Sequence, residues 1–167
     1  TLFFCFLNEI FIDGLSGMAL GLFSTLIIGT IICQLGSLIG GEVGTYLNAM
    51  GNVAKTLTGA GIGVGVASKL KCSPLVTVSA AVSGLVGAFP TVTAMEAFAV
   101  GKPGEPLGAF VAALVGIKLG QLVSGKTKVD IIVTPFTSIF CGSMVGFFVG
   151  PPISAFMTWL GELVNVN

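Results

Sequence analysis

The sequence predicts an all-helical (all-α) integral membrane protein, organised as a single transmembrane domain over residues 1–167. Only 8% of the residues are charged and 54% are hydrophobic, whereas about a quarter of a soluble protein is charged. The run Gly14–Gly41 carries no charge and exceeds the ~20 residues that a transmembrane helix needs. We expect about five transmembrane helices, one of them either tilted or broken (re-entrant) at a glycine-rich stretch, and an amphipathic helix at the N-terminus.

Charge and composition exclude several classes of function. Seven lysines balance seven acidic residues, so the net charge is zero, which argues against nucleic acid as a partner. The sequence has no histidine, so zinc or haem sites that use histidine and His-based catalytic triads are excluded. Cys5, Cys33, Cys72 and Cys141 are far apart and are expected to be reduced and packed. We expect no metal and no cofactor.

The N-terminal segment 1–13 is apolar, with Glu9 and Asp13 interspersed. This pattern is typical of an amphipathic helix that lies at the membrane surface and leads into a span. Both carboxylates would then lie near the lipid headgroups. The alternative is that Glu9 faces a pore.

The expected spans follow from the uncharged runs and the turn signals between them. Gly150-Pro151-Pro152 is expected to end the last span, because proline cannot donate to the helical hydrogen-bond ladder. The segment after it is then too short to cross and would lie on the surface or begin a further helix. The clear spans are Leu15–Leu38, a span within the uncharged run Ser73–Met95 that ends near Phe89-Pro90, Leu107–Val123 and Ile131–Val149.

A glycine-rich stretch lies between the first two of these spans, with glycine at every second position from Gly59 to Gly65. Each glycine weakens a helix by about 1 kcal/mol relative to alanine. The stretch is therefore either a closely packed helix or a broken segment that forms part of a ligand site, as in many transporters. In the second case Gly61 and Gly63 would lie at the site.

Lys118 is a charge inside an otherwise apolar span, with Gln121 one turn further on. A charge near the bilayer centre costs at least ~3 kcal/mol. Lys118 should therefore face protein or water and find an acidic residue or a polar ligand, unless its stem carries the charge to the interface.

Two further groups of polar residues flank the predicted spans. Thr91, Thr93 and Glu96 follow a proline and form either a polar pocket or a hydrated helix end. Asp130, followed by Thr134, opens the last span, where a carboxylate can accept hydrogen bonds from free N–H groups.

Lysine placement predicts the orientation of the chain. Lys126 and Lys128 form a basic turn, which is either an ordinary cytoplasmic loop or a surface facing a phosphorylated partner or an anionic headgroup. With five crossings, this turn, the Lys69–Lys71 turn and the N-terminus share one side. The positive-inside rule makes that side cytoplasmic.

Several strings resemble a bacterial family of membrane proteins similar to enzyme IIC of the phosphotransferase system, which includes the perfringolysin O regulator protein. They are DGLSGMALGLFSTLIIGTI (Asp13–Ile31), GAFVAALVG (Gly108–Gly116), KLGQLVSGKTKVDIIVTP (Lys118–Pro135) and VGPPISAFM (Val149–Met157). The most specific of these is LVSGKTKVDIIVTP. Family members are about twice as long, so the chain resembles the N-terminal half of a longer permease.

The resemblance implies a sugar permease component of the bacterial cell membrane, which binds a carbohydrate and passes it to a cytoplasmic phosphohistidine protein. No catalytic residue of its own is visible. The related permeases and the small-residue helix faces lead us to expect a homodimer. The residues expected near a neutral, hydroxylated ligand are Glu96 with Thr91 and Thr93, Lys118 with Gln121, Asp130 with Thr134, and Gly61 with Gly63.

Two other functions stay open at this point. One is a membrane sensor or regulator with the same fold and no transport. The other is an ion-coupled transporter or channel, which the intramembrane Lys118 and Lys55 motivate.

Overall fold

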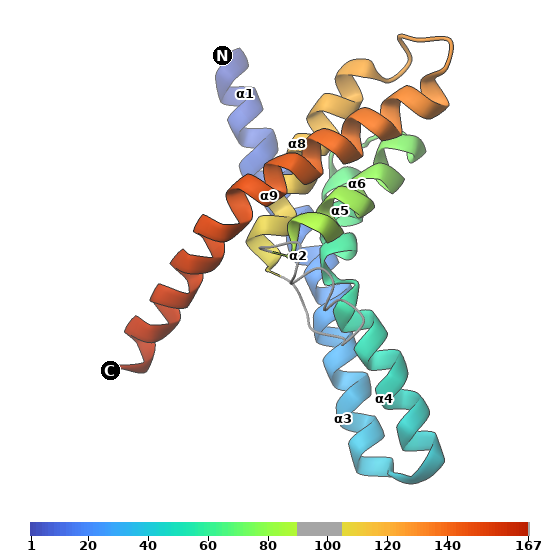
Figure 1. Ribbon diagram of the computed structural model, residues 1–167, viewed down its shortest axis with the longest axis vertical. Helices are drawn as coiled ribbons and strands as arrows, with labels where there is room; N and C mark the ends of the chain where they lie inside the picture. The colour runs from blue at the N-terminus through green and yellow to red at the C-terminus, as the bar shows by residue number, and fades with distance from the viewer. Residues whose placement is uncertain (90–104, 167) are drawn as a thin grey trace.

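The computed structural model describes residues 1–89 and 105–166, and all the regular structure in these ranges is helical. The first part of the chain forms one continuous helical rod (Figure 1). Along the rod the successive elements are α1 (Leu2–Asn8), the π-helical η1 (Glu9–Gly14), α2 (Leu15–Leu22), η2 (Phe23–Ile27, also π-helical) and α3 (Ile28–Ile39). At 1.5 Å per residue the rod is about 57 Å long, longer than the ~30 Å hydrocarbon core of a bilayer.

The prediction of a separate amphipathic helix at the N-terminus was wrong. Gly14, between the expected amphipathic helix and the expected span, has helical dihedrals of φ −63° and ψ −52°. The two π-helical turns absorb extra residues without interrupting the axis, as such bulges do in other helices. The segment after Thr1 is therefore continuous with the helix of the first span.

The rod folds back on itself through Gly40 and Gly41, which both have a φ of +65°, a conformation that favours glycine. α4 (Gly41–Thr56) and α5 (Thr58–Lys69) then run antiparallel to it. The break between these two helices is at Leu57 (φ −83°, ψ 12°). The glycine-rich stretch itself is helical and closely packed, and the break falls before the glycines.

Glycines let the rod and the returning helices meet backbone to backbone. Methyl groups on Gly17 and Gly21 would overlap the backbones of Gly65 and Gly61. Gly36 faces Gly44 in the same way at the far end. Small residues at this spacing are a common basis of helix packing in membranes.

The second half of the chain is a bundle in which α5 packs against α6 (Pro74–Gly87) and α8 (Pro106–Val123), while α9 (Asp130–Asn165) packs against α6 and α8. Its core includes Ile62, Val66, Val76 and Ile117, all at most 1% exposed. Glycines also bring these helices together, for example Gly116 against Ser138 of α9. Successive helices are antiparallel, so the N-terminus and the turns near residues 71 and 126 lie at one end, opposite the turn at Gly40 (Figure 1).

The predicted end of the last span at Gly150-Pro151-Pro152 was wrong. α9 is a single helix of 36 residues, and Pro135, Pro151 and Pro152 lie inside it. A proline removes one hydrogen bond from the ladder and has a φ that suits a helix, so the bonds of the turns before and after it hold the helix together.

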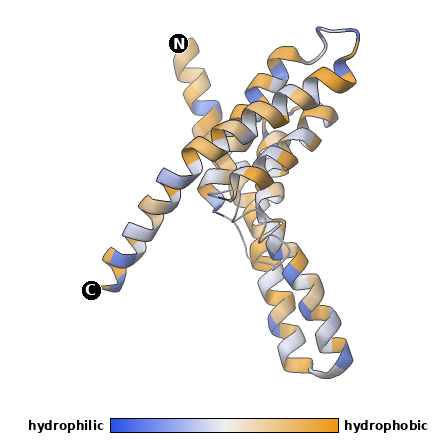
Figure 2. Cartoon of the chain, viewed as in Figure 1, coloured by the Kyte–Doolittle hydropathy of each residue, from blue (hydrophilic) through white to orange (hydrophobic). Residues whose placement is uncertain are grey.

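Within the described residues, three helical segments are long and apolar enough to cross a membrane: Leu2–Ile39, Pro106–Val123 and Asp130–Asn165, with Pro74–Gly87 as a shorter apolar helix. Hydrophobic residues cover most of these helices (Figure 2). The chain is thus a multi-pass, all-helical membrane protein embedded in a lipid bilayer.

Candidate functional site

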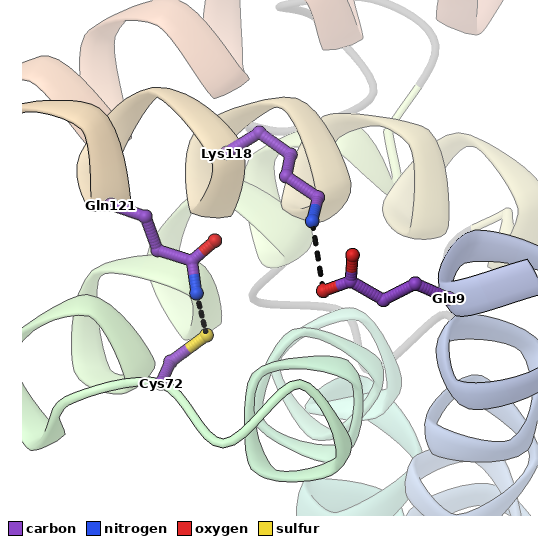
Figure 3. A network of polar contacts seen from close by, with 4 residues as sticks. All are labelled: Glu9, Cys72, Lys118 and Gln121. Carbon is purple, nitrogen blue, oxygen red and sulfur yellow. Dashed lines mark hydrogen bonds and ion pairs between the residues drawn. The ribbon is translucent and has the colours of Figure 1, made fainter. Parts of the chain in front are cut away.

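Lys118 of α8 forms an ion pair with Glu9 of the rod. Its Nζ lies 3.0 Å from Glu9 Oε1, and the two side chains are 25% and 39% exposed. The ammonium also lies 5.4 Å from the centre of the Phe6 ring, within the range of a cation–π contact. Figure 3 shows Lys118 and Glu9 reaching toward each other from separate helices. The expected acidic partner of Lys118 is therefore present in the chain itself.

Gln121 extends this contact toward the turn between α5 and α6. It lies three residues after Lys118, so both side chains leave the same face of α8. Its Nε2 donates to Cys72 Sγ over 3.2 Å. We call the five residues Phe6, Glu9, Cys72, Lys118 and Gln121 the Lys118 cluster. Figure 3 draws all of them except Phe6.

Local helix geometry places Glu9 in this cluster. Glu9 begins the π-helical turn η1, and such a turn rotates the residues before it relative to those after it. Gly14, at the end of the same turn, packs against the Phe110 ring of α8. The close contact at Gly14 and the ion pair at Glu9 together hold the N-terminal part of the rod against α8.

Cys72 lies in the turn outside the helices, and its environment alters its acidity. Burial raises the pKa of the Cys72 thiol above its ordinary value, the Lys118 ammonium partly opposes this shift, and Glu9 adds to it. The thiol is therefore protonated at neutral pH and weakly nucleophilic.

The Lys118 cluster combines a cation, an anion, an amide and an aromatic face in an otherwise apolar surrounding. An open surface depression of about 640 Å³ adjoins it, lined by Leu2, Phe3, Cys5, Phe6 and Glu9 of the N-terminal part of the rod. Sites for small polar ligands have this composition, with a few placed polar groups among apolar walls. The cluster can donate and accept hydrogen bonds without holding a net charge.

Asp130 and Thr134 form a separate group that closes the turn between α8 and α9. Asp130 Oδ1 accepts hydrogen bonds from the Gly125 backbone N–H (2.8 Å) and from Thr134 Oγ1 (2.5 Å). Gly125 has a φ of +77°. Asp130 thus binds an N–H of the preceding turn instead of a free N–H of its own helix. Lys126 and Lys128 lie exposed in this turn.

The two glycines predicted at a ligand site face neighbouring helices. A methyl group on Gly63 would overlap the Ala80 carbonyl of α6, and one on Gly61 would meet Thr25 of the rod. Gly61 also borders a groove of about 550 Å³ between the rod and α5, where Ser24, Thr25 and Ser68 supply the polar side chains. Thr91, Thr93 and Glu96 lie outside the described residues.

Sequence reasoning missed three residues of interest. Glu9 was expected near the headgroups, although the need of Lys118 for an acidic partner was a signal for it. Nothing in the sequence pointed to Cys72. Glu105, just before α8, has a buried Oε1 with no hydrogen-bond partner, while its backbone N–H donates to the Ala88 carbonyl 2.5 Å away.

A comparison with models of protein families identifies the family of the chain. The sequence model of the family described as "Phosphotransferase system, EIIC" matches residues 12–167. The chain belongs to this family. No curated protein and no solved structure matches it significantly.

Membership makes this EIIC chain a membrane component of a phosphotransferase system, whose other proteins are its general partners. The match begins at residue 12, so it covers Lys118, Gln121 and Cys72 and starts just after Glu9. Among the described residues, no group of three or more His, Cys, Asp or Glu side chains could hold a metal ion.

Proposed function

We propose that this EIIC chain is part of a sugar permease, which binds a carbohydrate in the membrane and presents it to a cytoplasmic phosphohistidine protein. The family match over residues 12–167 carries the proposal. The Lys118 cluster supports it, because a neutral, hydroxylated ligand needs both donors and acceptors in an apolar site. Phosphoryl transfer would then use the partner's histidine, which is consistent with the lack of histidine here.

The Lys118 cluster is the binding position that we favour for the sugar. The Lys118 ammonium would donate to a hydroxyl oxygen, the Glu9 carboxylate would accept from a hydroxyl, and the Gln121 amide can do both. The Phe6 ring offers an apolar face to the C–H face of a sugar ring. Asp130 with Thr134, Gly61 with Gly63, and Thr91, Thr93 and Glu96 remain secondary proposals for this role.

We further infer that the chain crosses the bacterial cell membrane five times, with its N-terminus in the cytoplasm. The five passes are the rod, the α4–α5 arm, α6, α8 and α9, since each is antiparallel to the one before it. Lys69, Lys71, Lys126 and Lys128 then share the cytoplasmic side. The exposed pair Lys126 and Lys128 is suited to contact the phosphorylated partner.

The test is uptake of a panel of radiolabelled sugars by cells that carry the full-length protein, with and without the general phosphotransferase proteins. We expect one sugar to accumulate as its phosphate only when those proteins are present. Uptake of free sugar without them would overturn the proposal in favour of an ion-coupled transporter or channel. Ligand binding without any uptake would overturn it in favour of a sensor.

The position of the site is tested with the sugar identified in that panel. Gln121→Leu should weaken binding to the purified protein at least tenfold, because an apolar side chain cannot replace the amide hydrogen bonds. Lys126→Gln, in the exposed turn, is the matched control and should bind normally. Equal affinity of Gln121→Leu and the wild type would exclude the Lys118 cluster as the sugar site.

A further inference from the structure

The groove between the rod and α5 owes its shape to glycines. Gly21 of the rod meets the backbone of Gly61 on α5, and Gly17 meets Gly65 in the same way. Because no side chain fills the angle between the two helices at these contacts, a trough of about 550 Å³ remains there. The large side chains along it are apolar and exposed, namely Leu20, Leu57 and Val64.

This groove is continuous with an apolar surface of the α3–α4 hairpin. Its α5 residues recur at intervals of three and four from Leu57 to Ser68, which places them on one helix face. The same spacing leads back from Leu57 to Val53, Met50 and Tyr46 of α4, all of them exposed. A row of large apolar side chains on a membrane helix suits contact with lipid tails. The groove therefore opens onto a lipid-facing surface.

The length of the groove matches one leaflet of a bilayer. From Leu57 to Ser68 the helix rises about 17 Å, roughly half of the ~30 Å hydrocarbon core. An acyl chain that runs parallel to the two helices would fill the groove from the middle of the bilayer to its surface. Its headgroup would then lie beyond Ser68.

Opposite charges lie at this end of the groove. The pairs Gly21–Gly61 and Gly17–Gly65 are each four residues apart, so one more step of four brings Asp13 of the rod level with Lys69 of α5. Lys71 follows Ser68 by three residues and so continues the groove face. Asp13, Lys69 and Lys71 are all exposed, and within the described ranges 1–89 and 105–166 none of them forms an ion pair.

We propose that the groove binds one phospholipid with a zwitterionic ethanolamine headgroup. An acyl chain lies in the groove, the Lys71 ammonium binds the phosphate, and the Asp13 carboxylate binds the ethanolamine ammonium. The Ser68 hydroxyl can donate to a phosphate oxygen. The pair of charges favours this headgroup, because an anionic lipid without an amine would satisfy the lysine and be repelled by Asp13.

The headgroup is tested by native mass spectrometry of the full-length protein, titrated in mild detergent with phosphatidylethanolamine or phosphatidylglycerol. We expect one phosphatidylethanolamine per chain, retained at about fivefold lower concentration than phosphatidylglycerol, since one charge near a headgroup changes affinity by about that factor. Asp13→Asn should remove the preference, and Lys71→Gln should weaken the binding of both lipids. Lys126→Gln, in the other exposed turn, is the matched control and should change neither.

The groove itself is tested by filling it. Val64→Trp should abolish the retained lipid, whereas Val78→Trp, at an exposed position of α6, should not. Both variants should keep the size-exclusion profile of the wild type, because each side chain lies at the surface. The proposal would be overturned by equal retention in Val64→Trp and the wild type, by equal affinity for the two lipids, or by no retained lipid. These substitutions lie outside the Lys118 cluster, so sugar binding is tested separately.

Discussion

Lys118 illustrates how one charged residue can be accommodated in an apolar helix. A lone ammonium at membrane depth costs at least ~3 kcal/mol, and the Glu9 carboxylate 3.0 Å away offsets much of that cost. The partial exposure of both side chains leaves the pair weaker than a fully buried one. The ion pair therefore ties the rod to α8 at moderate strength, which leaves it open to competition by a polar ligand.

Removing one member of the ion pair should lower the free energy of unfolding more than removing both members. Lys118→Met leaves Glu9 without its partner, and we expect a loss of about 1–2 kcal/mol, below the 3–5 kcal/mol of fully buried pairs. For a protein of this size that lowers the thermal midpoint by about 2–8 °C, measured by fluorescence in detergent. Glu9→Gln combined with Lys118→Met should recover most of the loss. A double variant as unstable as the sum of the two single variants would contradict the pairing.

The reactivity of the Cys72 thiol should depend on the charges of Glu9 and Lys118. Burial raises its pKa, Lys118 opposes this and Glu9 adds to it, and the thiolate is the reactive form. Glu9→Gln should therefore lower the pKa and speed alkylation by a maleimide at pH 7, while Lys118→Met should raise the pKa and slow it. The check is the alkylation rate between pH 6 and 10, in protein with the other cysteines changed to Ser. Identical profiles for all three proteins would show that the cluster does not form.

Among the helices, glycine contacts determine which elements can approach each other. Gly21 of the rod faces Gly61 of α5 so closely that neither position has room for a Cβ. Helix association in membranes depends on such close contacts, because the hydrophobic effect does not favour helix over lipid. The rod and α5 should therefore separate when either glycine is enlarged.

A substitution at the contact between Gly21 and Gly61 tests the packing of the rod against α5. Gly21→Leu should prevent correct packing of the rod and lower the yield of folded protein in detergent at least fivefold, measured by size-exclusion chromatography. Gly161→Leu is the matched control, because a Cβ at Gly161 meets nothing within 4 Å and leucine favours helix over glycine. The contact would be refuted if both variants gave the same yield.

The outcome for individual helices shows what sequence patterns can and cannot determine. The spans around Leu107–Val123 and Leu15–Leu38 were predictable, because long uncharged runs have few alternatives to a membrane helix. The continuation of the helices through Gly14 and Pro151 was not predictable from sequence. A π-turn or a proline within a helix depends on support from the neighbouring turns. The pairing of Glu9 with Lys118 was not predictable for the same reason, because it follows from the unbroken rod.

At the scale of the whole molecule, successive antiparallel packing separates the turns into two groups. The N-terminus and the turns near residues 71 and 126 lie at one end, and the Gly40–Gly41 turn lies at the other (Figure 1). Alternating runs of charge and hydrophobicity made this arrangement predictable. The candidate ligand site was harder to predict. Lys118 and Gln121 were recognisable as polar residues in a span, but their partners Glu9 and Cys72 come from distant parts of the chain.

The arrangement of the turns is testable by labelling in intact cells. Single cysteines at Lys71, Lys126 and Gly40, placed one at a time in the cysteine-free protein, are exposed to an impermeant maleimide. We expect Gly40→Cys to be labelled from outside, and the other two only after the cells are opened. Labelling of Lys71→Cys and Gly40→Cys from the same side would contradict the proposed crossings.

The prolines inside α9 give its final part a mechanical property. Pro151 and Pro152 lack N–H groups, so the carbonyls of Phe147 and Phe148 receive no bond from the residue four positions later. Bending stiffness is lowest at such a point. The residues from 153 to Asn165 form a lever about 20 Å long, so a bend of about 10° at the prolines moves the tip by about 3.5 Å. Small rearrangements of the bundle would thus become large displacements at the tip of α9, which lies at the end of that helix away from the turn near residue 126.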